Sequence, residues 1–176
     1  MDKPPRYTLA AIAIHWLTAI LVVALFALGW YMVDLPKGPA RARMFALHKS
    51  LGLTVLWLLG LRLVWRRGHP PPALPASMAR WQRRLAHGVQ HLLYVLLAMQ
   101  PLSGYLSSSF SGHDTAYFGL PLPSWGHHDA RLNAFFTEVH AACAIALLAA
   151  VAVHLAGALS HARVGGENVL RRMRPW

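Results

Sequence analysis

Residues 140–154 read HAACAIALLAAVAVH, an apolar stretch with His140 at one end and His154 at the other. Imidazole is costly to bury in lipid, so a histidine inside a membrane segment points to a functional site. Fourteen residues at about 100° each bring a helix back to nearly the same face, roughly 21 Å further along. This spacing lets a single helix hold one axial ligand of each of two stacked haems.

The stretch belongs to one of four long apolar runs in a chain of 176 residues that is 56% hydrophobic. The runs cover about residues 9–33, 45–65, 85–110 and 135–160, and each supplies the ~20 residues that a bilayer helix needs. The segments between them are too short for a separate soluble domain. We therefore predict an all-α membrane protein, with a single four-helix transmembrane bundle spanning residues 1–176.

The net charge of +11 is distributed as in a membrane protein rather than in a nucleic-acid-binding protein. A four-span topology places 12 of the 17 basic residues on the side of the two termini. The positive-inside rule makes that side cytoplasmic. The first run follows Lys3 and Arg6 but is too long for the core of a signal peptide, so we expect an uncleaved first helix.

Two further histidines, His15 and His48, lie in the first and second runs. Depth in the bilayer pairs His15 with His154 on the cytoplasmic side, and His48 with His140 on the periplasmic side. Two bis-histidine haem sites stacked across the membrane form a route for electrons, because six-coordinate haem leaves no open position for a substrate. The alternative for each histidine is a polar contact between packed helices.

The cysteine and the acidic residues limit how a haem could be held and which classes of membrane protein fit the sequence. Cys143 is the only cysteine and no CxxCH motif is present, so a haem would be held by coordination and packing alone. The six acidic residues lie in predicted loops or at helix ends, which argues against a proton-coupled transporter with a buried acid. A non-redox histidine-based transporter or metal-binding membrane protein is the alternative from another class.

Several neighbouring residues are candidates for supporting roles. Lys49, Arg41 and Arg43 lie at the level of the haem propionates or are solvated interfacial charges. Gly52, one turn after His48, would clear space for a ring. The loop at residues 111–128 is predicted to cover the periplasmic end of the bundle.

Three histidines near the cytoplasmic side are candidates for a quinone site. His161 follows His154 by seven residues and shares its face, so we predict a hydrogen bond from it to a quinone. The alternative is an interfacial histidine without a role. His87 and His91 open the third run and are weaker candidates for a quinone pocket or for a replacement haem ligand.

The order of these features resembles the bacterial cytochrome b561 family, four-helix dihaem membrane cytochromes. The resemblance covers nearly the whole chain and includes the four histidines in order. The supporting motifs are Ile14-His15-Trp16, Val64-Trp65-Arg66, Leu85-Ala86-His87, Pro101-Leu102-Ser103-Gly104, Phe118-Gly119-Leu120 with Pro123, and the tail from Glu167 to Met173.

The resemblance implies two b-type haems, electron exchange with ubiquinone and a place in the bacterial inner membrane. It matches the pairs deduced from depth, and it puts His161 at the quinone site. Some members resemble superoxide oxidases, in which superoxide reduces the periplasmic haem and ubiquinone is reduced at the other end. A cluster of Lys37, Arg41, Arg43 and Lys49 would then steer the superoxide anion. The alternative is a quinol-linked relay to or from a soluble periplasmic redox partner.

Overall fold

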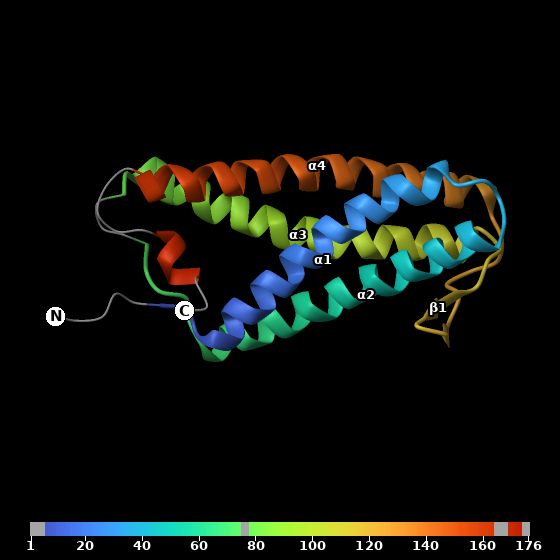
Figure 1. Cartoon of the computed structure of the whole chain (residues 1–176), viewed down its shortest axis with the longest axis horizontal. Coiled ribbons are helices and arrows are strands. Elements are labelled where there is room, and N and C mark those ends of the chain that lie inside the picture. Colours follow the sequence, from blue (N-terminus) through green and yellow to red (C-terminus); the bar gives the residue numbers. More distant parts are fainter. Residues whose placement is uncertain (1–5, 75–77, 164–168, 174–176) are drawn as a thin grey trace.

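The computed structural model describes residues 6–74, 78–163 and 169–173. Four long helices run antiparallel to their chain neighbours (Figure 1): α1 (Leu9–Asp34), α2 (Pro39–Gly68), α3 (Arg80–Phe110) and α4 (Ala130–Arg163). A short 3-10 helix, η1 (Val169–Met173), follows α4. The starts of α1 and α3 and the ends of α2 and α4 lie together at one end, here called the basic end. A β-hairpin marks the opposite end, here called the hairpin end.

Each predicted apolar run lies within one helix, but three helices are longer than their runs. Helix α2 begins at Pro39 rather than near residue 45, α3 begins at Arg80 rather than near 85, and α4 begins at Ala130 rather than near 135. Apolar runs mark only the hydrocarbon span, and the helices continue into polar residues beyond it. Pro39 also suits the first helical position, where no backbone N–H is needed.

Three of the helices, α1, α2 and α4, are long and apolar enough to cross a membrane. The predicted fourth span, α3, contains Arg80, Arg83 and Arg84 in its first two turns, and polar residues such as Gln90 and Gln100 further along. These residues lower its hydropathy although it is as long as the others. The fourth span and the cytoplasmic position of the termini stay predictions.

The bundle is two helical hairpins with a small apolar core between them. Helix α3 packs along α4, α1 along α2, and α2 along α3, whereas α1 and α4 are not closely packed along their length in the described residues. The core consists of Leu96, Leu147 and Ala150, against which Val22 and Phe26 of α1 pack. Leu147 is 3% exposed and lies seven residues from both His140 and His154. The core therefore separates the levels of the two histidines.

The loop after α3 contains two short strands, β1 (Thr115–Tyr117) and β2 (Leu120–Leu122), which the sequence did not predict within this mostly helical chain. Their turn residues Phe118 and Gly119 both have positive φ, 48° and 89°, as a tight two-residue hairpin turn requires. The hairpin docks on α2, where the Ser50 hydroxyl accepts a hydrogen bond from the Phe118 N–H at 3.0 Å. Ser50 is only 3% exposed.

We expect Ser50→Ala to loosen the hairpin without unfolding the bundle. The substitution leaves the Phe118 N–H without its acceptor, which costs about 1–3 kcal/mol if that group stays buried. Amide hydrogen exchange in peptides covering residues 115–122 should become faster. The control is Ser160→Ala, because the Ser160 hydroxyl is exposed and donates to the carbonyl of Gly157 in its own helix. Equal exchange in the two variants would contradict this role of Ser50.

Candidate functional site

The structure brings the four membrane histidines together as the two pairs deduced from depth. His15 of α1 faces His154 of α4, with ring centroids 6.3 Å apart. His48 of α2 faces His140 of α4, with ring centroids 6.2 Å apart. Helix α4 contributes one ring to each pair, at opposite ends of the apolar core.

The separation of the rings fits a shared metal. A transition metal lies about 2 Å from each coordinating imidazole nitrogen, so two imidazoles on one metal have centroids roughly 6 Å apart. Each pair supplies only two ligands, and no group of three His, Cys, Asp or Glu side chains that could hold a metal ion occurs among the described residues. This donor set suits a metal that brings its own in-plane ligands, as haem iron does.

Helix α3 orients the ring of His140. The Nδ1 of His140 lies 2.8 Å from the carbonyl oxygen of Gln100, which can only accept, so Nδ1 carries the proton. The basic nitrogen is then Nε2, as metal-ligating histidines commonly have it. The Nε2 currently accepts a hydrogen bond from the Gln100 side-chain amide at 3.1 Å. Gln100 is thus a positioning residue that the sequence did not reveal.

Two glycines make room for the rings at the hairpin end. A Cβ at Gly104 would lie 3.1 Å from Cε1 and Nδ1 of His140, and a Cβ at Gly29 would lie 3.4 Å from Cε1 of His48. Gly52 has no neighbouring atom within 4 Å of its Cβ position, so the space beside it is open, and its role in clearing space for a haem ring stays a prediction. The close approach to the His48 ring comes from Gly29 of α1.

Two buried polar atoms at the hairpin-end pair lack hydrogen-bond partners. They are Nδ1 of His48 and Oε1 of Gln100. An unsatisfied buried polar atom costs about 1–3 kcal/mol, so such atoms are expected where a site awaits a ligand. Together with the ring spacing and the glycine clearances, they show that the residues present fit a haem between His48 and His140.

The four cations predicted to steer superoxide at the hairpin end differ in exposure and in contacts. The Arg41 guanidinium donates to the carbonyl of Leu35 at 3.0 Å and lies over the ring of Phe45. Lys37 and Arg43 are exposed, whereas Lys49 is half-buried next to His48. Of these four cations, Lys49 is therefore the closest in the sequence to a histidine of this pair.

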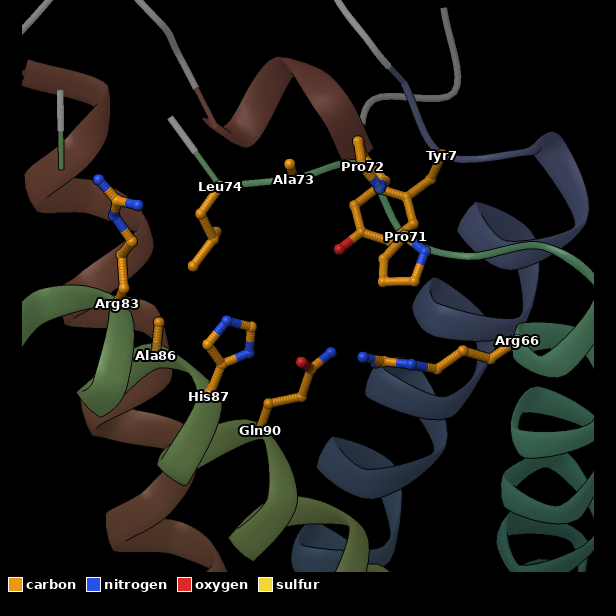
Figure 2. Close-up of a pocket in the computed structure, with 10 residues that line it drawn as sticks. All are labelled: Tyr7, Arg66, Pro71, Pro72, Ala73, Leu74, Arg83, Ala86, His87 and Gln90. Carbon is orange, nitrogen blue, oxygen red and sulfur yellow. The ribbon is translucent and has the colours of Figure 1, made fainter. Parts of the chain in front are cut away.

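The basic end has a cavity of about 300 Å³ between the starts of α1 and α3 and the proline-rich loop (Figure 2). Arg66 and Arg83 approach it from opposite sides, His87 and Gln90 extend into it from α3, and Tyr7 covers it. The Tyr7 phenol is protonated at neutral pH and can donate a hydrogen bond, and burial raises its pKa further. The cavity therefore offers several donors to an oxygen-bearing ligand.

Of the other candidate histidines, one lines the basic-end cavity and two make contacts elsewhere. His87 lines the basic-end cavity, but the Nδ1 of His91 lies 2.7 Å from the carbonyl of His87 in its own helix. His69 stacks on Trp65, with ring centroids 4.1 Å apart. The side chain of His161 lies outside the part of the chain whose side chains are described.

Comparison with known proteins agrees with this geometry. Residues 6–176 match the family model described as prokaryotic cytochrome b561. The chain belongs to the prokaryotic cytochrome b561 family. It is therefore a bacterial membrane protein of electron transfer, from a family that binds haem b.

Named relatives cover almost the full length of the chain. It is 32% identical over 180 residues to cytochrome b561 homolog 2 of Escherichia coli (strain K12), covering 98% of this chain and 93% of the relative. It is 25% identical to cytochrome b561 homolog 1 of the same organism, covering 97% of each. It is 26% identical to the probable superoxide oxidase CybB of Yersinia pestis, covering 97% of this chain and 96% of the relative.

Substitution of one histidine should remove one haem of this cytochrome b561-family protein. We expect His140→Ala or His48→Ala to lose the hairpin-end haem, and His15→Ala or His154→Ala the other. Haem content per protein, measured from the Soret and reduced α bands, should fall by about half because each pair is predicted to hold one iron. His91→Ala is the control. A wild-type protein without these bands, or single variants that keep both haems, would contradict the assignment.

The role of Gly104 can be tested separately from the ligands. Gly104→Val should displace the His140 ring and lower haem occupancy at the hairpin end, because a Cβ there lies 3.1 Å from the ring. Gly88→Val is the matched control on the same helix, since its Cβ position has no neighbouring atom within 4 Å. The reduced optical spectrum measures the loss. The same haem content in both variants would show that the clearance is unimportant.

Proposed function

We propose that this protein oxidises superoxide to dioxygen at the hairpin end and reduces ubiquinone to ubiquinol at the basic end. Two superoxide anions each lose one electron and leave as dioxygen. Ubiquinone gains these two electrons and two protons. With the predicted topology, superoxide is taken from the periplasm and the protons from the cytoplasm.

The observation that carries the proposal is that a single helix, α4, contributes one ring to each of two imidazole pairs. His140 and His154 are 14 residues apart on α4, and each faces a histidine from the other helical hairpin. When bound, two haems b would supply one-electron chemistry at a six-coordinate iron with no open position. Leu147 and its neighbours fill the level between the pairs and exclude water from it.

The choice of superoxide is supported by charge at the hairpin end and by one relative. A small anion is attracted by a local group of cations, which raises its encounter rate. Lys49 follows His48 directly, with Lys37, Arg41 and Arg43 at the same end of the bundle. The positive-inside rule disfavours cations on this side, so their presence calls for a role. The Yersinia pestis relative is named a probable superoxide oxidase.

The choice of ubiquinone is supported by the donors at the basic end. A quinone offers two carbonyl oxygens as acceptors, and the Tyr7 hydroxyl, the His87 ring and the Gln90 amide all border the cavity there. Pro71, Pro72 and Leu74 provide apolar surface for the quinone ring. We propose that these donors orient the quinone and pass protons to it, with His161 as a further predicted contact.

Stopped-flow mixing with superoxide tests the proposal against a relay to a soluble periplasmic partner. We expect rapid haem reduction that slows as salt is added, because screening weakens the attraction of the anion. Lys49→Gln should slow reduction roughly two- to tenfold at low salt. The control is Arg131→Gln, which removes an exposed charge at the same end.

Ubiquinone must then reoxidise the reduced haems. Slow reduction that does not depend on salt would instead favour the relay, and the partner would have to reduce the haems faster than superoxide does. A purified protein that contains no haem would favour the non-redox alternative.

A further inference from the structure

Three donors converge on the hydroxyl of Tyr94 near the basic end of the bundle. The Arg66 guanidinium lies 3.1 Å from this oxygen, and Nε of Arg62 and Nε2 of Gln90 each lie 3.4 Å from it. Arg66 also lies over the Tyr94 ring, 5.9 Å from its centroid. Two positively charged side chains therefore share one neutral oxygen.

A phenol oxygen is a poor partner for two guanidinium groups. It has two lone pairs and no charge, whereas each arginine presents several donors in a planar fork that suits a carboxylate. Among the described residues the acids are Asp34, Asp114, Asp129 and Glu138, all towards the hairpin end. Neither Arg62 nor Arg66 is paired with any of these four. Half-buried cations that no acid in the described part of the chain neutralises predict an anionic ligand.

The arginines lie beside one of the histidine pairs. Arg62 of α2 and Ile14 of α1, the residue before His15, line the same narrow gap. Arg66 and Tyr94 line it as well. The expected anion would thus lie close to the His15–His154 pair, inside the bundle rather than on its surface.

We propose that Arg62, Arg66 and Tyr94 bind the propionate groups of a haem held between His15 and His154. The inference rests on the proposed function only in requiring a haem at this pair. A haem b carries two carboxylates, and each needs a cation or hydrogen-bond donors when it leaves water. Two arginine forks and a phenol hydroxyl match this need in number and type.

The cluster fits a propionate better than a quinone. A quinone is neutral and would not compensate the two guanidinium charges, whereas the two carboxylates balance them. The quinone proposed above takes donors from the adjacent cavity, which Arg66 also borders. Arg66 would therefore lie between the haem edge and the quinone.

The test compares Arg62→Gln and Arg66→Gln with the control Arg67→Gln in the purified haem-loaded protein. Arg67 is an exposed neighbour on α2, so its loss removes a charge of the same sign from the same helix end. Redox titration should show the midpoint potential of the His15–His154 haem shifting to more negative values, because reduction of the haem is less favourable without the nearby cation. Resonance Raman bands of the propionates should shift in the same variants.

The potential of the His48–His140 haem, identified by its loss in His140→Ala, should not change in any of the three variants. Arg62→Lys keeps the charge and should restore the potential while the Raman bands stay altered, because an ammonium cannot form the two-bond contact. If a glutamine variant fails to hold haem, Arg62→Lys and Tyr94→Phe carry the same Raman comparison.

Potentials and Raman bands in Arg62→Gln and Arg66→Gln that equal those of Arg67→Gln would overturn the proposal. So would an effect seen in nanodiscs with phosphatidylglycerol but absent in phosphatidylcholine alone, because the bound anion would then be a lipid phosphate. If superoxide fails to reduce the wild-type haems, superoxide is not the substrate. The potentials and Raman bands of the arginine variants would still test the propionate contacts. A wild-type protein that binds no haem between His15 and His154 would also overturn the proposal.

Discussion

Imidazole rings inside an apolar bundle need partners, and this need organises the rest of the structure. Burying a polar group without a hydrogen bond or a metal costs several kcal/mol at most sites, and four rings lie at membrane depth here. The rings face each other in two pairs across the gap between the helical hairpins, where a shared metal would meet that cost. Helix α4 takes part in both pairs, so under the proposed function its geometry sets where electrons enter and leave.

The two ends of the bundle support their ring pairs by different means. At the hairpin end the support is steric and polar: Gly29 and Gly104 leave room for the rings, and Gln100 orients His140. At the basic end the proposed support is electrostatic, because Arg62 and Arg66 converge on Tyr94 beside a gap that Ile14 also lines. This difference in charge would make the two haems unequal acceptors, which an electron route between different partners requires.

Much of this arrangement could be predicted because helical periodicity is local. The 14-residue spacing on α4 follows from 3.6 residues per turn, and depth along apolar runs is enough to match His15 with His154 and His48 with His140. The role of Gln100 was not predictable, because its carbonyl reaches His140 across 40 positions in the chain. The close approach of Gly29 to the His48 ring was not predictable for the same reason, since periodicity within one helix says nothing about the next helix.

The sequence by itself determined the number of long helices, the histidines that lie on them and the concentration of basic residues at one end. These features follow from composition and from the repeat of a single helix. Only the tertiary structure decided the 6.2 and 6.3 Å ring separations, the hairpin docked on Ser50 and the convergence of Arg62 and Arg66 on Tyr94. Each of these depends on how far apart two helices pack, and that distance is set by side chains remote from one another in the chain.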